Sequence, residues 1–242
     1  MKKTIHYCWF GRKKLPDSAI RCISSWKKYF PDYTIKEWNE DNFNVYMTKY
    51  TSQAYEKGKY AFVSDYARFY ILFHEGGVYF DTDVEVIKPF DDIVNRGAFM
   101  GCEVDGSDME RIEVAPGLGI ASEPNNEIYK DILELYSNIS FINEDGTINT
   151  KTVVYYTTNI LLKHGLENIT GIQTVKDITI YPKEYFCPYD YRNGITTKTD
   201  NTHSIHWNSM TWVSKNRVIV SRITRVLHRM FGNDCLRFIK NR

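Results

Sequence analysis

The chain has 242 residues, of which 43% are hydrophobic and 15% aromatic, enough to bury the core of one sizeable α/β domain. Its formal net charge of +1 gives no reason to expect a nucleic-acid partner. Five cysteines are scattered without a C-x-x-C pair, which argues against a disulfide framework or a zinc site and for a reducing compartment.

The first residues do not have the pattern of a secretory leader. Met1 to Thr4 lead into a segment studded with polar residues instead of an apolar one. No run of 18 apolar residues occurs, so we expect no membrane-spanning helix. These features together predict a cytoplasmic protein.

The first part of the chain predicts alternating strands and helices. Residues 4–9 form a short apolar run, and residues 17–30 carry apolar side chains at helical spacing. Pro31 and Asp32 break that helix, and residues 33–38 alternate as a second strand. This alternation predicts a mostly parallel sheet, in which ligands bind beyond the carboxyl ends of the strands.

A helix with an aromatic stripe precedes the glycine pair at residues 76 and 77. Its aromatic residues recur at helical spacing: Phe62, Tyr66, Phe69 and Phe73. The glycine pair ends the helix because glycine accepts the left-handed conformation of helix ends. Asp65 and Arg68 are three residues apart and share neighbouring faces of the helix. Because the helix leads straight into a strand and packs back on the sheet, we expect both side chains near the acidic end of that strand.

Residues 77–86 are rich in Val, Tyr and Phe and are predicted to form this strand, which Pro89 closes. Because strand side chains alternate between faces, Asp81 and Asp83 would point to the same side, about 6–7 Å apart. Mg²⁺ and Mn²⁺ are commonly held by one or two carboxylates together with substrate phosphate oxygens. The pattern predicts a metal site for a phosphate-bearing substrate. The alternative is a solvated strand end, since D-x-D often occurs by chance.

The composite motif is more specific than its parts. S-D-x-x-R followed by G-G-x-Y-x-D-x-D resembles the sugar-nucleotide site of glycosyltransferase family 32 and, more distantly, the glucosylating domain of large clostridial toxins. The resemblance implies a Rossmann-like GT-A fold in which Asp65 and Arg68 bind the sugar and ribose of the donor. It also implies that Tyr79 supports the donor, and that Asp81 and Asp83 bind the metal and the nucleotide diphosphate.

The resemblance covers residues 5–90 and includes the end of the first strand. Trp9-Phe10-Gly11 resembles the W-x-G of the family, whose Trp stacks on the base of the donor. A Trp at a strand end is more commonly a core residue, but the resemblance implies that Trp9 is a platform for the base. Further along, residues 116–122 (PGLGIAS) are small enough for a ligand to approach the backbone closely, although no residue there is nominated.

Residues 202–212 (THSIHWNSMTW) hold a second candidate group. A lone histidine such as His206 is commonly structural. Against the I-H-H-x-x-x-S-W of the family, His206 takes the place of the first His, and Trp207 stands in place of the second. Thr211 and Trp212 take the places of the final Ser and Trp. The resemblance implies that His206 is a third metal ligand, that Thr211 contacts phosphate or metal, and that Trp212 closes over the donor.

The chain changes character at Val213. Residues 213–242 hold eight Lys or Arg and one acid, Asp234. Apolar residues in this segment lie on one predicted helical face: Ile219, Ile223, Val226, Leu227 and Met230. A basic amphipathic helix is typical of a membrane-surface anchor, although a helix docked on the domain would give the same pattern. We divide the chain into a GT-A domain at residues 1–212 and a basic helical tail at residues 213–242.

The sequence therefore predicts a metal-dependent glycosyltransferase that uses Mn²⁺ or Mg²⁺ and a nucleotide-diphosphate sugar, a UDP-sugar. The expected acceptor is a polysaccharide, as in capsule synthesis, or a lipid-linked glycan, and the resemblance implies retention of anomeric configuration. Residues 213–242 would meet an anionic membrane at the inner face of the cell membrane. One alternative is a haloacid dehalogenase-type phosphatase, which expects Thr or Val where Glu85 stands. Another is a carbohydrate-binding module, which explains the aromatic residues but not the spacing of the carboxylates.

Overall fold

The computed structural model describes residues 1–209. The predictions for Thr211, for Trp212 and for the tail at residues 213–242 lie outside the described residues. No helix within the described part of the chain combines the length and apolar character needed to cross a bilayer.

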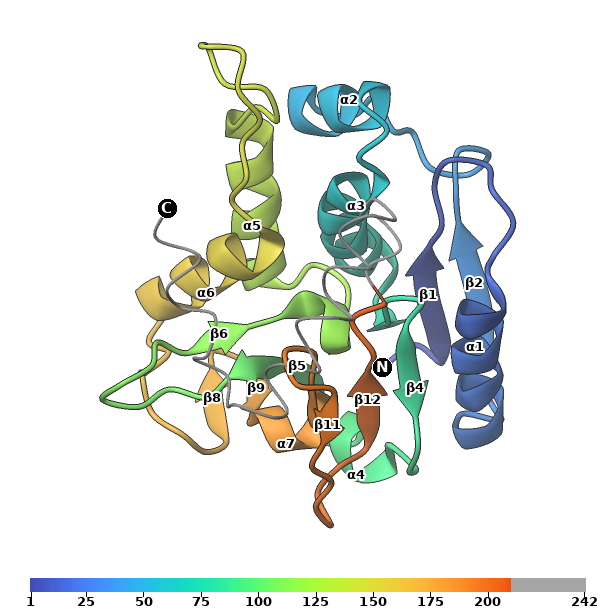
Figure 1. Cartoon of the computed structure of the whole chain (residues 1–242), viewed down its shortest axis with the longest axis vertical. Coiled ribbons are helices and arrows are strands. Elements are labelled where there is room, and N and C mark those ends of the chain that lie inside the picture. Colours follow the sequence, from blue (N-terminus) through green and yellow to red (C-terminus); the bar gives the residue numbers. More distant parts are fainter. Residues whose placement is uncertain (210–242) are drawn as a thin grey trace.

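Helices and strands alternate through most of the described chain (Figure 1). The α-helices within residues 1–209 are α1 (Asp17–Tyr29), α2 (Lys49–Glu56), α3 (Tyr60–Glu75), α4 (Asp91–Val94), α5 (Glu127–Asn138), α6 (Val153–Lys163) and α7 (Lys183–Phe186). The strands are β1 (Thr4–Cys8), β2 (Thr34–Trp38), β3 (Gly77–Tyr79), β4 (Val84–Val86), β5 (Ala98–Val104), β6 (Glu113–Val114), β7 (Ile120–Ser122), β8 (Gln173–Val175), β9 (Ile178–Tyr181), β10 (Tyr189–Asp190), β11 (Ile195–Thr196) and β12 (Ser204–His206).

The central sheet of the described residues has eight strands, with the order β2-β1-β3-β7-β5-β9-β8 and with β6 paired to β5. β1 runs parallel to both β2 and β3, and β5 runs parallel to β9. β7 lies antiparallel between β3 and β5, so five of the eight strands share one direction. This arrangement confirms the predicted α/β fold with a mostly parallel sheet.

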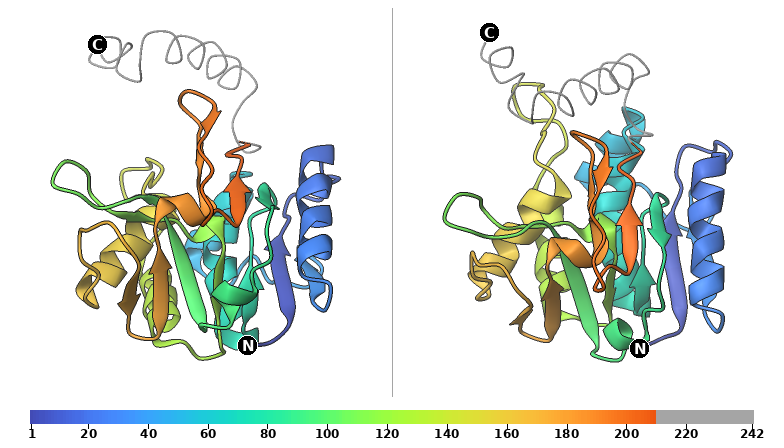
Figure 2. Two further views of the ribbon diagram at one scale, coloured as in Figure 1. Left: turned by 90° about the horizontal axis from the view of Figure 1, so that it is seen from below. Right: turned by 60° about the horizontal axis from the view of Figure 1, so that its bottom comes forward.

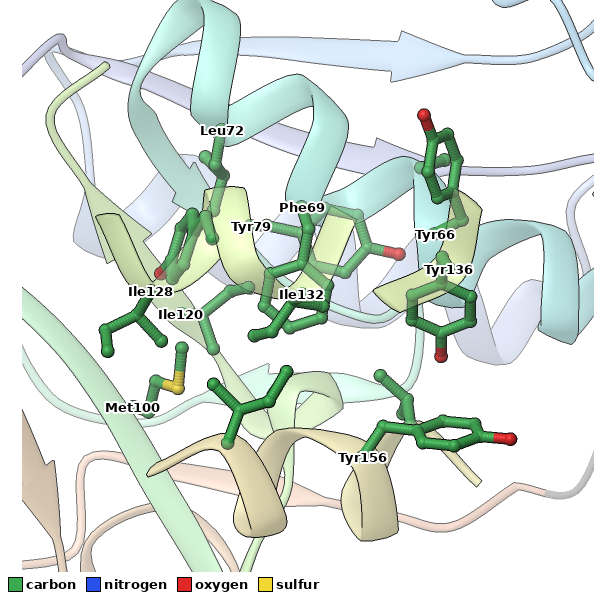
Figure 3. Packing of buried hydrophobic residues seen from close by; sticks show 14 of the residues in the cluster. Tyr66, Phe69, Leu72, Tyr79, Met100, Ile120, Ile128, Ile132, Tyr136 and Tyr156 are labelled. Atoms are coloured by element: carbon green, nitrogen blue, oxygen red, sulfur yellow. The ribbon is translucent and has the colours of Figure 1, made fainter. Parts of the chain in front are cut away.

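Helices cover both faces of the sheet (Figure 1). Because strand side chains alternate between faces, β1 sends Cys8 into one hydrophobic cluster and Ile5 and Tyr7 into the other. The first cluster packs the sheet against α3, α5 and α6, where Phe69 and Tyr136 are fully buried (Figure 3). The second packs it against α1, α4 and α7. The predicted aromatic stripe of α3 thus faces the core.

α3 ends at the glycine pair, as the sequence predicts. Gly76 and Gly77 have φ angles of 64° and 104°, which glycine adopts without strain. A Cβ atom on Gly77 would also lie 2.7 Å from the backbone oxygen of Thr4. The pair therefore lets α3 turn directly into β3, close against β1.

The predicted single strand over residues 77–86 is wrong. β3 ends at Tyr79, and the backbone N–H of Val84 donates to the carbonyl of Asp81 at 3.0 Å, which closes a turn. β4 then pairs with β12 in a separate two-stranded sheet. Aspartate and threonine favour such turns because their side chains form hydrogen bonds with nearby backbone groups, in competition with the hydrogen bonds of a strand. Asp81 and Asp83 accordingly lie in a turn and not along one strand face.

Candidate functional site

Asp65, Arg68 and Asp81 form one ion network at the junction of α3 and the turn after β3. The Nη2 atom of Arg68 lies 3.0 Å from Oδ1 of Asp65 and 3.2 Å from Oδ1 of Asp81. The hydroxyl of Tyr79 donates to the same oxygen of Asp81 at 3.0 Å. The Nε atom of Arg68 donates to the backbone carbonyl of Ser64 at 3.1 Å, which fixes the guanidinium on its helix. Asp65 and Arg68 of α3 therefore lie beside Asp81 of the D-x-D segment, as we expected.

Burial strengthens the electrostatic interactions among the charged groups of this network. Arg68 is 3% exposed and Asp65 9% exposed. Burial raises the pKa of Asp65 to about 7, against the opposing effect of Arg68, and the nearby charge of Asp81 adds to the rise. Burial acts to lower the pKa of Arg68, but the neighbouring Asp81, Tyr79 and Asp65 raise it above its ordinary value. Arg68 is thus a fixed cation with a carboxylate on each side.

The small-residue segment at residues 116–118 leaves room for Asp81. A Cβ atom added to Gly117 would collide with Oδ2 of Asp81 and would lie 3.4 Å from Nη1 of Arg68. The backbone N–H of Asp81 donates to the carbonyl of Gly117 at 3.2 Å. Gly117 is therefore part of the site, although the sequence indicated only that the backbone is accessible in this segment.

Asp83 belongs to a second group, built where β4 meets β12. His206 pairs with Val84 across this ladder, and its Nε2 atom lies 3.0 Å from Oδ1 of Asp83. The backbone N–H and the hydroxyl of Ser209 donate to Oδ2 of Asp83 at 2.8 and 2.9 Å. Ser209 carried no signal in the sequence, because its partner lies 126 residues away.

The electrostatics of Asp83 and His206 are coupled. Burial opposes the charged form of Asp83, but His206 and Ser209 outweigh it and hold the pKa of this carboxyl well below its ordinary value. Burial likewise opposes the charge on His206, and Asp83 outweighs it and raises the pKa of the imidazole. The pair is therefore stabilised as a carboxylate and an imidazolium.

The predicted metal ligands do not converge on one point. Within residues 1–209, no group of three or more His, Cys, Asp or Glu side chains is arranged to hold a metal ion. Asp81 contacts Arg68 and Tyr79, whereas Asp83 contacts His206. A carboxylate and a neutral imidazole are ligands that suit Mn²⁺, so an ion bound by this pair would displace the proton of His206, whose Nδ1 atom is buried without a partner in the described chain. Two protein ligands fit an ion that takes its other ligands from substrate phosphates and water.

Trp9 follows β1 and is half-buried. Its indole N–H donates to the carbonyl of Lys13 at 2.6 Å, and its ring packs against the second hydrophobic cluster. These contacts fix the ring after the carboxyl end of β1, and its role as a base platform stays a prediction. Thr211 and Trp212, the remaining nominated residues, lie outside the described chain.

The α/β fold places the buried Asp65–Arg68–Asp81 network next to the D-x-D turn, within a segment that is similar to a known sugar-binding region. Residues 16–100 match the family model described as the glycosyltransferase sugar-binding region containing the DXD motif. The match confirms, over these residues, the resemblance to DXD-containing glycosyltransferases that the sequence predicted. It spans α1 through the first residues of β5 and so includes both aspartates of the motif.

A curated relative is inositol phosphoceramide mannosyltransferase 1 of Schizosaccharomyces pombe, 27% identical over 109 residues. The match covers 40% of this chain and only 33% of the relative. Among solved structures, the chain resembles the PaToxG glycosyltransferase (22% identity, 67% and 69% of the two chains, TM-score 0.47). It also resembles a glycosyltransferase involved in glycosylation of the major capsid of PBCV-1 (13% identity, 92% and 98%, TM-score 0.48). A galactosyltransferase in complex with donor and acceptor sugar analogues is similar as well (14% identity, 93% and 94%, TM-score 0.44).

Proposed function

We propose that this protein transfers a sugar from a nucleotide-diphosphate donor, a UDP-sugar, to a hydroxyl of a glycan acceptor, with the help of Mn²⁺ or Mg²⁺. The observation that carries the proposal is the contact of Arg68 with both Asp65 and Asp81, directly beside the Asp83–His206 pair. Neither a phosphatase nor a carbohydrate-binding module needs a buried arginine held between two carboxylates at this point of the fold.

Under this proposal, the role of each residue follows from the chemistry of its side chain. Arg68 supplies a fixed positive charge and, with Asp65, orients the donor sugar, and such orientation alone removes several kcal/mol of a barrier. Tyr79 holds Asp81 in place through its hydroxyl. Asp83 and His206 would hold the metal ion, which supplies positive charge to the leaving diphosphate when bound. All of these groups are preorganised by buried contacts before the donor arrives.

The donor and acceptor are narrower proposals. A uridine nucleotide fits the family resemblance, with Trp9 as the platform for the base and Thr211 and Trp212 as further contacts. The relative named above acts on inositol phosphoceramide, which supports a lipid-linked or glycan acceptor here. Retention of anomeric configuration follows from the same resemblance.

The decisive assay measures release of the nucleoside diphosphate from UDP-, GDP- and CMP-sugars with Mn²⁺, with Mg²⁺ and with a chelator. We expect release from a UDP-sugar only when a divalent ion is present. The Asp83→Asn variant should lose this activity, whereas Asp32→Asn, at an exposed surface ion pair with Lys3, should retain it. Turnover that survives both the chelator and Asp83→Asn would refute metal dependence, and no turnover of any nucleotide sugar would refute the transferase assignment.

We further propose that the protein is cytoplasmic and that residues 213–242 bring it to an anionic membrane surface, at about 1 kcal/mol per basic residue. Flotation of the 242-residue chain with vesicles of anionic and of neutral lipid tests this idea. Replacement of three arginines by glutamine in the full chain should abolish binding to the anionic vesicles: Arg222, Arg225 and Arg229. Equal flotation of both proteins would refute a role for the tail.

A further inference from the structure

A cavity of about 260 Å³ lies beside Asp83, on the side of α1 and β4. The residues that matter for its chemistry are Ser18, Arg21, Asp83, Glu85, Trp207 and Ser209. They come from α1, from the turn and strand after β3, and from the segment that follows β12. Figure 2 shows β12 at the end of the sheet opposite the N-terminus. The cavity is thus assembled from segments far apart in the sequence.

Trp207 presents a fixed aromatic surface to this cavity. The residue is 36% exposed, yet its indole N–H donates to Oε2 of Glu85 at 2.8 Å. Its backbone N–H donates to the carbonyl of Asp83 at 3.0 Å. The ring of Tyr189 packs against it in a tilted arrangement, with 5.3 Å between the ring centroids. Because three contacts already hold this exposed tryptophan, its ring loses little conformational entropy when a ligand binds.

The groups around this ring suit a sugar. A pyranose has an apolar face of C–H bonds, which can stack on an aromatic ring, and a rim of hydroxyls that need polar partners. The carboxylate of Glu85 can accept hydrogen bonds beyond the one from Trp207, while Arg21 and Ser18 offer donors. An apolar surface with a few convergent polar groups is the usual composition of a small-molecule site.

The position of the cavity relative to the donor site indicates whether it would bind the donor sugar or the acceptor sugar. The cavity shares Asp83 and Ser209 with the candidate site, and none of Asp65, Arg68 or Asp81 lines it. The donor sugar is assigned to that network, so a sugar on Trp207 would be a second sugar, next to Asp83. Transfer requires a second sugar close to the donor, because the acceptor hydroxyl must reach the reacting carbon next to the diphosphate.

We infer that this cavity is the acceptor subsite and that it binds a pyranose ring stacked on Trp207, with its hydroxyls on Glu85 and Arg21. The inference rests on the proposed transferase function and adds the place and the chemical class of the acceptor. The family pattern has its second histidine at this position, so the aromatic platform is a feature of this chain and not of the motif.

Saturation-transfer NMR of the full-length protein with UDP, Mg²⁺ and a panel of methyl glycosides of glucose, galactose and mannose tests the inference. We expect at least one glycoside to receive signal from the wild type. Trp207→Ala should weaken its affinity about fivefold or more, the loss expected when a stacking ring is removed. Trp207→Phe keeps a ring and should recover most of the signal. Ile20→Ala, on the exposed face of α1, is the matched control and should behave as the wild type.

Three results would overturn the inference: no glycoside signal with the wild type, equal glycoside affinity in Trp207→Ala and the wild type, or a loss of UDP affinity as large as the loss of glycoside affinity. The last result would place Trp207 in the donor site. Failure of the transferase assignment is a separate outcome. A protein that turned over no nucleotide sugar but bound glycosides through Trp207 would be a glycan-binding protein and not a transferase.

Discussion

The buried side chain of His6 should make the folded protein less stable as the pH falls. The side chain is fully buried in β1, between Trp38 of β2 and the turn at Gly76. The indole N–H of Trp38 donates to its Nδ1 atom at 3.0 Å, so Nδ1 must be the acceptor. The proton is therefore on Nε2, which donates to the carbonyl of Gly76 at 3.0 Å. Protonation of the ring would set two N–H groups against each other.

Burial lowers the pKa of His6 from 6.5 to about 4, even though Gly76 and Glu75 favour the charged form. The unfolded chain takes up this proton as the pH falls through 6.5, whereas the folded chain does not until about pH 4. The free energy of unfolding that His6 contributes is thus fully present above the unfolded pKa and is lost as the pH falls between these values. The loss amounts to about 2 kcal/mol between pH 7.5 and pH 5, and to about 3 kcal/mol by pH 4.

Urea unfolding of the wild type and of His6→Gln, followed by tryptophan fluorescence at about pH 8.5, 7.5, 6.5 and 5, measures this contribution. Glutamine does not titrate, and all other groups are common to both proteins. The variant should be less stable at pH 7.5, since its buried hydrogen bonds are imperfect. Its free energy of unfolding should then fall by about 2 kcal/mol less than that of the wild type on acidification to pH 5. Parallel decreases in the two proteins would refute the reasoning, whereas between pH 8.5 and 7.5 the curves should be parallel.

Three further predictions concern buried groups. Arg68→Leu leaves Asp65 and Asp81 without their cation and should lower the free energy of unfolding by about 3 kcal/mol or more. If the unpaired carboxyl groups cause this loss, adding Asp65→Asn and Asp81→Asn to Arg68→Leu should restore stability. Gly117→Ala should displace Asp81 and raise the Michaelis constant for the nucleotide sugar, at a cost of about 1–3 kcal/mol in stability; an unchanged constant would contradict the assigned contact. In a protein with Cys22→Ser and Cys235→Ser, a thiol reagent should label no cysteine before urea unfolds it, because burial raises the pKa of the thiols and blocks access to them: Cys8, Cys102 and Cys187.

The local signals of α3 were sufficient to predict its part of the site. The aromatic stripe gave the buried face, the glycine pair gave the end of the helix, and together they placed Asp65 and Arg68 over the turn after β3. Each of these inferences uses residues within about one or two turns of each other, where helical periodicity is reliable. The contact of Arg68 with Asp81 then follows from the direct connection of helix and strand.

The remaining contacts of the site depend on strand pairings between distant parts of the chain, which a local sequence pattern does not indicate. The apolar residues on both sides of Asp81 and Asp83 read as one strand, yet β4 leaves the main sheet because β12, far along the chain, offers it a partner. Ser209 reaches Asp83 only through this ladder. Gly117 was visible as a small residue, but its contact with Asp81 depends on β7 entering the sheet beside β3.

The turn gives the two aspartates of the motif different partners. On a continuous strand both would face one side and share one cation. In the structure, Asp81 shares Arg68 with Asp65, while Asp83 is paired with His206. Under the proposed function, two protein ligands are too few to retain a divalent ion, since Mg²⁺ and Mn²⁺ take the rest of their ligands from phosphate and water. The ion and the donor diphosphate are therefore expected to bind as one unit, between a positioning network that orients the sugar and a cavity that can admit the acceptor.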